Sequence, residues 1–259
     1  MTTALPYASV GFSLAGGQVT WLLLVLMRTT GLVVTAPLLG HRAVPNAVKA
    51  GLAAVLALAL AGGASAVPDA QPAVLAAPIE LLIGACLGMI LTLGFHAIEI
   101  VGRILALQMG LSLGAVFSPT SREEGTALDP LFAILAGLLF LALNLHTGTI
   151  RVLAASFEAL PLGGGWPADL WLLAARMTAL AMELGARVGL PLVLILLLVE
   201  LSVALLARAI PQINVFILGL PIKVMAGITV TALALPNLVT GGTMIFRFLV
   251  DGITSGVVR

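Results

Sequence analysis

The sequence predicts an all-α membrane protein, and three observations support this fold class. Apolar residues make up 61% of the chain and charged residues 9%, against roughly 45–50% and ~25% in ordinary globular domains. The apolar residues gather in long runs, several of which reach the ~20 residues that a helix needs to cross a bilayer. One core of a 259-residue chain cannot enclose this much apolar surface. The chain must bury it in lipid, in other subunits, or in both.

Six apolar runs define the expected elements, at residues 20–39, 47–67, 74–117, 127–157, 170–207 and 211–240. The first run has no basic segment before it, and Arg28 and Arg42 accompany it, so we expect a retained segment and not a cleaved signal peptide. The runs at 74–117 and 170–207 are too long for one simple span each. The 28 glycines favour close packing between helices. A formal net charge of +1 gives no indication of a nucleic acid partner.

Charges in the connectors predict an orientation under the positive-inside rule. The connectors at 40–50 and 208–223 carry cations and are expected on the cytoplasmic side, whereas those at 62–78 and 160–169 are expected on the periplasmic side. Arg247 and Arg259, near the C-terminus, do not follow this scheme.

The connector at 208–223 has the most unusual composition. Proline removes a backbone donor and clashes with the preceding turn, so Pro211 and Pro221 predict breaks or kinks. A backbone group that a break frees inside a membrane needs a protein or water partner. We therefore expect a polar connector that is either buried in an assembly or set at a membrane boundary, with a recognition surface that includes Pro211, Gln212, Asn214, Phe216, Pro221 and Lys223.

Ionisable residues inside the apolar runs form the next pattern. Glu99 and Arg103 are four residues apart, as are Glu183 and Arg187, so each pair shares a helix face and is expected to form a buried ion pair. His96 lies on the same face as Glu99 and Arg103. A proton or ion relay along these residues is the alternative, because such chains line transporter pathways.

The segment from Gln108 to Phe117 alternates small and larger residues. Gly110, Ser112 and Gly114 are interspersed with Leu111 and Leu113, and Met109 and Phe117 are its bulky side chains. Glycine inside a helix permits a variable backbone. The segment is either the loosely wound end of a helix or a flexible apolar loop that seals a pore.

No catalytic, metal or cofactor site is predicted. Gly110-Leu-Ser-Leu-Gly114 fits the G-x-S-x-G nucleophile elbow, but an elbow follows a strand, and the residues before Gly110 are expected to be helical. His146 is the only later histidine. No H-E-x-x-H, P-loop or zinc spacing appears. We therefore expect a protein that is not an enzyme.

Motifs spread over nearly the whole chain resemble those of the FliR family, flagellar export-apparatus proteins related to the SctT components of injectisomes. Taken singly each motif is weak, but their order is specific, and Gly219-Leu-Pro221 looks more flagellar than injectisome-like. The matching pieces are Arg28, Ala36–Gly40, Val44-Pro45, Glu80–Gly84, Gly88, Gln108–Ser112, Asn144–His146, Ser156-Phe157, Pro161, Pro211–Phe216 and Pro221–Lys223.

Two positions depart from the family pattern. The family often has Asn-Gly-His where this chain has Asn144-Leu145-His146, which implies less backbone freedom near His146. It also has Asp-Pro where this chain has Ser118-Pro119, which removes a charge beside the predicted loop.

The resemblance implies an architecture of broken helical hairpins, in which residues 1–187 form a FliP-like part and residues 188–259 a FliQ-like hairpin. Such a chain assembles with FliP, FliQ and FlhB subunits into a helical, pore-bearing export gate for unfolded substrates. The gate lies in the bacterial inner membrane, within the flagellar basal body. Much of its apparently transmembrane helix is packed against other subunits above the bilayer.

By the same resemblance, residues 108–117 and the polar turn after them form the plug of the channel. The residue pattern agrees, because an apolar constriction excludes water and ions by dewetting. A secondary transporter of a small solute is the alternative, although we find no internal repeat of the kind such proteins have. An intramembrane hydrolase would require Ser112 and His146 to meet.

Overall fold

The computed structural model describes residues 16–41, 43–64, 72–111, 128–209 and 215–257. Within these ranges the chain is helical with short connections and contains no strand, which confirms the predicted all-α class. The helices are α1 (Gly16–Thr35), α2 (Asn46–Leu60), the short 3-10 turn η1 (Ala61–Gly63), α3 (Ala73–Met109), α5 (Asp129–Ala142), α6 (Leu145–Ala159), α7 (Ala168–Ala209) and α8 (Val215–Val257).

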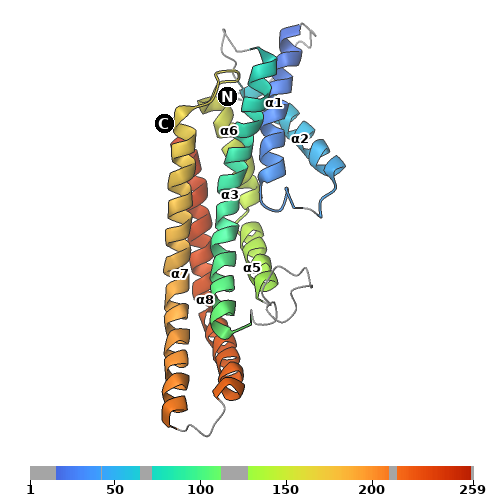
Figure 1. Cartoon of the computed structure of the whole chain (residues 1–259). Helices are drawn as coiled ribbons and strands as arrows, with labels where there is room; N and C mark the ends of the chain where they lie inside the picture. The colour runs from blue at the N-terminus through green and yellow to red at the C-terminus, as the bar shows by residue number, and fades with distance from the viewer. Residues whose placement is uncertain (1–15, 42, 65–71, 112–127, 210–214, 258–259) are drawn as a thin grey trace, which may run out of the picture.

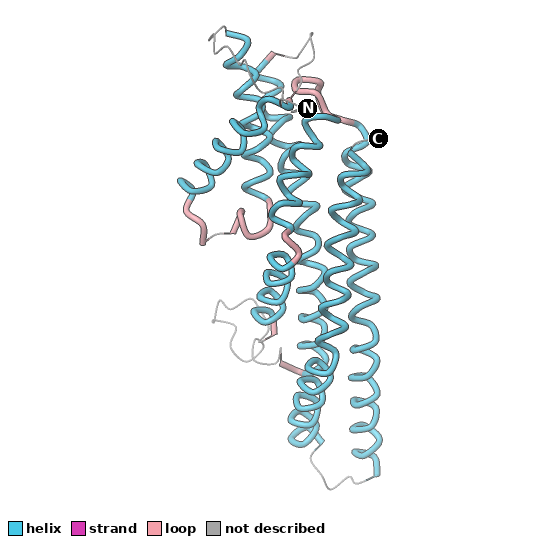
Figure 2. Tube along the Cα trace, turned by 180° about the vertical axis from the view of Figure 1, so that it is seen from behind, coloured by secondary structure: helices cyan, strands magenta, loops and turns pink. Residues whose placement is uncertain are grey.

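Three long helices, α3, α7 and α8, lie side by side and set the length of the molecule (Figure 1). α1 and α2 lie beside the upper half of α3, and α5 lies beside its lower half; the reverse view shows the same arrangement (Figure 2). α7 has 42 residues and α8 has 43. At a rise of 1.5 Å per residue each is about 63 Å long, roughly twice the thickness of a hydrocarbon core. The expectation that the longest runs exceed one simple span is therefore confirmed.

By length and composition, three of the described helices can cross a membrane, in α3, α7 and α8. A fourth span is possible if α5 and α6 count as one broken element, bent by 68°. The sequence predicted a single run over 127–157. The bend falls at Asn144, which has a left-handed backbone with φ of 53°, a conformation that asparagine tolerates better than most residues.

Two predicted boundaries near the C-terminus are wrong. The connector expected at 208–223 is shorter, because α7 continues to Ala209 and α8 begins at Val215. Pro221 therefore lies inside α8. α8 also continues to Val257, beyond the predicted end at residue 240, because Gly241 and Gly242 are accommodated inside the helix.

α1 and α3 cross with their backbones in contact. A methyl group added at Gly31 would overlap with the Leu81 carbonyl, and one added at Gly84 would overlap with the Arg28 carbonyl. The Thr35 hydroxyl also donates a hydrogen bond to the Ala85 carbonyl oxygen, at 3.0 Å. Small residues thus let the two helices approach closely, as they do in membrane helix pairs.

Large side chains fill notches left by glycine where α3 meets the other helices. The Phe246 ring of α8 occupies the space beside Gly94, where a Cβ atom would lie 2.6 Å from the ring. Phe246 also packs edge to face against Phe95 and Phe140, with ring centroids 5.3 and 6.1 Å away. This cluster joins α3, α5 and α8 in the core.

Candidate functional site

The first candidate element is the predicted plug, whose beginning lies at the end of α3. The helix ends at Gly110, which has a left-handed backbone with φ of 78°. The Gly110 amide donates to the Leu107 carbonyl and the Leu111 amide to the Ala106 carbonyl, each at 3.0 Å. These two bonds form a Schellman cap, in which glycine adopts the left-handed turn without a Cβ penalty. Gly110 therefore fixes the point at which the chain leaves α3.

Gln108 and Met109 belong to α3 itself. Met109 is completely buried, and its side chain fills the space beside Gly227 of α8. Its thioether packs inside this single chain, and a part of Met109 in blocking the channel stays a prediction. The remaining predicted plug residues, Ser112, Leu113, Gly114 and Phe117, lie outside the described residues.

The structure also bears on the nucleophile elbow that begins at Gly110. Such an elbow requires a strand before the serine, but the residues preceding Gly110 are the last turns of α3. Among the described residues, no group of three or more His, Cys, Asp and Glu side chains could hold a metal ion.

The second candidate element is the bend between α7 and α8. Pro211, Gln212 and Asn214 lie outside the described residues, and Phe216 is described only as part of the α8 helix. Lys223 of α8 forms an ion pair with Glu200 of α7, with 2.7 Å between Lys223 Nζ and Glu200 Oε1. This pair joins the two helices of the hairpin close to their connection, and it was not predicted.

The third candidate element is the set of ion pairs. Glu183 and Arg187 contact each other, with 2.6 Å between Glu183 Oε1 and Arg187 Nη2. Their side chains are 55% and 72% exposed on this single chain. Burial of the pair therefore requires a second subunit, and it stays a prediction.

Glu99 and Arg103 find different partners. Glu99 Oε2 lies 3.2 Å from His96 Nδ1 on the same helix. Arg103 Nη2 lies 3.4 Å from Asp129 Oδ2, at the start of α5. Arg103 thus connects α3 to α5, whereas the predicted pairing lay within one helix.

A buried ion pair that the sequence did not predict joins α1 to α3. Arg28 of α1 and Glu80 of α3 are joined by a 2.6 Å contact between Nε and Oε2, and their side chains are 0% and 2% exposed. Two full charges removed from water are stable only with good geometry and further hydrogen bonds. The surrounding backbone supplies such bonds to Arg28 Nη1 and Glu80 Oε1, whereas Arg28 Nη2 is buried without a hydrogen-bond partner among the described residues.

Arg28 is bonded to the carboxyl end of α6. Its Nη1 atom donates to the carbonyl oxygens of Ser156 and Leu160, at 2.8 and 2.9 Å. The last carbonyls of a helix attract cations, and the Ser156 carbonyl also accepts a hydrogen bond from the Leu160 amide at 3.0 Å. The guanidinium also lies 5.0 Å from the centre of the Phe157 ring, within cation–π range. Arg28 therefore caps α6 from a different helix.

Glu80 is bonded to the loop that follows α6. Its Oε1 atom accepts a hydrogen bond from the Gly163 amide at 3.1 Å. Gly163 has a left-handed φ of 77°, which glycine adopts readily. Leu162, next to it, is completely buried. Together, Arg28 and Glu80 hold the α6–α7 loop against α1 and α3, and we call these two residues and their backbone partners the Arg28 node.

The Arg28 node unites motifs that the sequence presented separately. Arg28, Glu80 and Ser156-Phe157 each contributed to the family resemblance, but their sequence separation gave no reason to place them in contact. The helical i, i+4 rule identifies pairs within one helix. The available signal was a lone cation in the run at 20–39 and, in the run at 74–117, a carboxylate with no cation three or four residues away, because unpaired charges are costly there.

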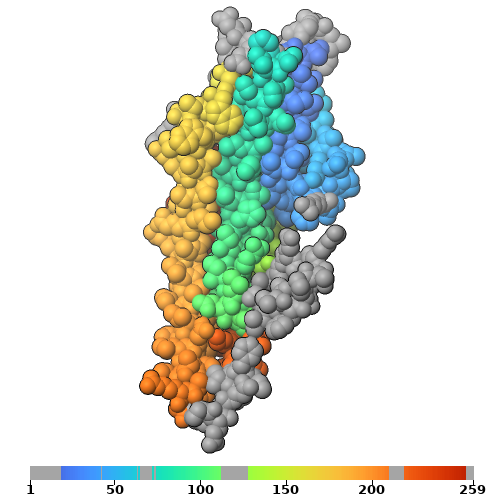
Figure 3. Space-filling model, viewed as in Figure 1, coloured from blue at the N-terminus to red at the C-terminus, as the bar shows by residue number. Residues whose placement is uncertain are grey.

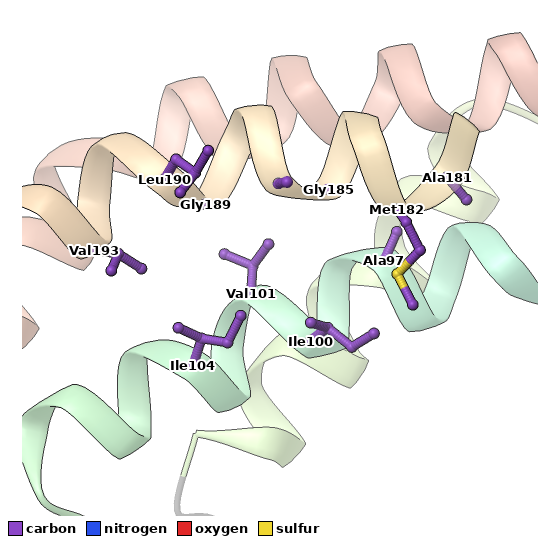
Figure 4. A pocket seen from close by; sticks show the side chains of 11 residues that line it. Ala97, Ile100, Val101, Ile104, Ala181, Met182, Gly185, Gly189, Leu190 and Val193 are labelled. Carbon is purple, nitrogen blue, oxygen red and sulfur yellow. The ribbon is translucent and has the colours of Figure 1, made fainter. Parts of the chain in front are cut away.

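A shallow apolar groove of about 230 Å³ lies between α3 and α7. Ala97 and Val101 of α3 and Gly185 and Gly189 of α7 line it where the helices come closest, and Leu190 lies at its edge (Figure 4). The groove offers no polar side chain for catalysis, so it fits an apolar group.

The lower half of the α7–α8 hairpin exposes bulky apolar side chains. The lower part of α7 forms one edge of the molecule in the space-filling view (Figure 3). The exposed side chains include Leu190, Leu194, Leu198, Leu201 and Leu205 of α7 and Met225, Ile228 and Leu233 of α8. Patches of this kind mark contacts with lipid or with other proteins.

Comparisons with known proteins are consistent over most of the chain. The family model described as bacterial export proteins, family 1, matches residues 19–249. The flagellar biosynthetic protein FliR of Escherichia coli (strain K12) is 35% identical over 82% of each chain. The FliR of Pectobacterium carotovorum subsp. carotovorum is 34% identical over 81% of this chain and 82% of its own. The FliR of Bacillus subtilis (strain 168) is 30% identical over 78% and 81%.

Proposed function

Because this chain belongs to family 1 of the bacterial export proteins, within the FliR group, we propose that it is a core subunit of the gate of the flagellar export apparatus. It is a multi-pass helical membrane protein of that apparatus. The proposal concerns its position: it forms part of the pore through which unfolded export substrates pass, and part of the plug that closes the pore.

The exposed apolar hairpin is the observation that carries the assembly proposal. Leu198 of α7 and Leu233 of α8 are 63% and 77% exposed on the single chain. Burying apolar surface contributes roughly 25 cal/mol per Å², so these faces favour equally apolar neighbours. FliP, FliQ and FlhB type proteins of the inner membrane are the proposed partners, in keeping with the family resemblance.

The two-part organisation stays part of the proposal. Residues 1–187 would correspond to a FliP-like part and residues 188–259 to a FliQ-like hairpin. The antiparallel pairing of α7 and α8 supports a hairpin. The proposed boundary falls inside α7, which is continuous from Ala168 to Ala209. The two parts would therefore share one continuous helix, which contains Pro191 close to the boundary.

The plug proposal rests on the end of α3. The buried Met109 and the Gly110 cap give the following segment a fixed starting point. Deletion of residues 110–117 is expected to leave assembly intact and to let small ions leak across the membrane. Unchanged ion permeability in that deletion would contradict the plug assignment. Ser112→Ala is expected to be nearly neutral for export, whereas a hydrolase that used Ser112 would lose its function.

Native mass spectrometry tests the assembly proposal. The tagged chain would be expressed with its chromosomal neighbours and extracted in mild detergent. One copy of this chain, in a large complex with several copies of two small apolar partners, is the expected result. A monomer or homodimer that is stable without partners would refute the proposal and favour a secondary transporter of a small solute.

A further inference from the structure

We propose that the α6–α7 loop and the two helix ends that flank it carry a protein-binding surface, with the exposed residues Trp166, Trp171, Glu158 and Asp169, for a partner segment that presents basic side chains. We call these four residues the tryptophan surface. The residues of this surface are observed independently of the gate proposal. The gate proposal is used only to say that the partner is another protein of the export apparatus.

Two of the three tryptophans of this chain are exposed. Trp166 is 45% exposed in the α6–α7 loop, and Trp171 is 62% exposed in the first turn of α7. The start of α7 lies at the upper end of the molecule in Figure 1. Tryptophan is among the residues most enriched at the energetically dominant positions of protein interfaces.

The loop that carries Trp166 is anchored by hydrogen bonds from the Arg28 node. The Arg28 node fixes the loop through the Gly163 amide and the Leu160 carbonyl. Leu162 and Leu170 are buried on either side of Trp166. A loop that is already ordered before binding loses less conformational entropy when a partner docks. The Arg28 node therefore anchors the loop at Leu160 and Gly163, shortly before Trp166.

Lipid is a poorer occupant than protein, because of where the charges of α7 lie. Tryptophan is common at membrane interfaces, but the first half of α7 carries the exposed residues Arg176, Glu183 and Arg187. Such charges are costly in hydrocarbon. The second half, residues 188–207, carries only Glu200. If that half lies in the bilayer, Trp171 lies about 25 Å beyond it at 1.5 Å per residue.

Charge complementarity identifies the partner's chemistry. Glu158, in the last turn of α6, and Asp169, in the first turn of α7, are both exposed, and neither forms an ion pair with another described residue. No lysine or arginine occurs from 158 to 175. Lysine and arginine pair with carboxylates and also stack on tryptophan rings. Part of the Asp169 charge is offset by the dipole of α7, so the tryptophans are expected to contribute more than the acids.

Site-specific photo-crosslinking in the intact complex tests this proposal. A benzophenone amino acid would replace Trp171 in cells, and the same probe at Val55, an exposed position on α2, would serve as the control. The expected adduct is a protein segment that contains lysine or arginine within one helical turn of the crosslink, and it is absent from the Val55 control. An adduct with phospholipid only, an adduct with an acidic segment, or no adduct would each overturn the proposal.

A binding measurement with the crosslinked segment, made as a synthetic peptide, provides the second arm. Trp166→Ala and Trp171→Ala are each expected to weaken its binding to the purified complex at least tenfold, and Asp169→Lys by a similar factor. Val55→Ala is expected to change binding less than twofold. Equal effects in all variants would overturn the proposal. Co-purification of the apolar partners, measured on the same samples, separates a failure of this surface from a failure of the gate proposal.

Discussion

Substitution of Arg28 by methionine is expected to destabilise this chain more than any exposed charge substitution. Methionine keeps much of the volume of the side chain but removes every hydrogen bond that Arg28 makes. Glu80 would remain buried as an uncompensated carboxylate, with the Gly163 amide as its one remaining donor among the described residues. The carbonyls of Ser156 and Leu160 would also lose their Arg28 donor.

The magnitude follows from burial. Both side chains of the pair are at most 2% exposed, so solvent screening is small. Removing one partner of a buried ion pair costs about 3–5 kcal/mol. We expect the free energy of unfolding of Arg28→Met to fall by that amount. The double variant Arg28→Met/Glu80→Met is expected to recover more than about 1 kcal/mol, because it no longer buries a lone charge.

Unfolding in mixed micelles, followed by the helical circular dichroism signal, measures these differences. Arg151→Met is the matched control, because Arg151 is exposed on α6 and forms no ion pair with another described residue. Its effect is expected within about 0.5 kcal/mol. A loss below about 1 kcal/mol in Arg28→Met, or an equal loss in Arg151→Met, would refute this account of the Arg28 node.

Three further predictions concern helix contacts. Gly84→Ala is expected to lower the thermal unfolding midpoint by several degrees, because the new methyl group meets the α1 backbone, whereas Gly51→Ala, with open space around its Cβ, is expected to raise it slightly; equal shifts would contradict the close crossing. A double-mutant cycle on Glu200 and Lys223 is expected to give a coupling below about 1 kcal/mol, because both side chains are partly exposed; a larger value would show that a partner buries the pair. Arg187→Leu is expected to reduce recovery of the assembled complex in native mass spectrometry, and unchanged recovery would show that the Glu183–Arg187 pair is solvated.

The fold class and most helices were predictable because they depend on local composition. Apolar runs placed both ends of α1 and α7 and the starts of α2 and α3 close to their observed bounds, whereas α2 and α3 end at Leu60 and Met109, before the predicted ends at 67 and 117. The break at Asn144 was missed because no proline or glycine marks it. The end of α8 was missed because Gly241 and Gly242 resemble a terminus, although packing against Val188 and Leu139 keeps them helical.

The candidate site was less predictable because its contacts join distant segments. The i, i+4 rule identified Glu183 and Arg187, which do contact each other. The same rule gave the wrong partner for Arg103, because Asp129 of α5 lies within reach. Nothing in the sequence indicated that Met109 packs inside the chain, because that depends on the notch at Gly227.

The notches at glycine also limit how the sequence can change over time. The Met109 side chain occupies the space beside Gly227, and the Phe246 ring occupies the space beside Gly94. A larger residue at either glycine is tolerated only if the opposing side chain becomes smaller in the same lineage. Positions 109 and 227, and positions 94 and 246, should therefore vary as pairs among relatives of this protein, with the summed volume of each pair nearly constant.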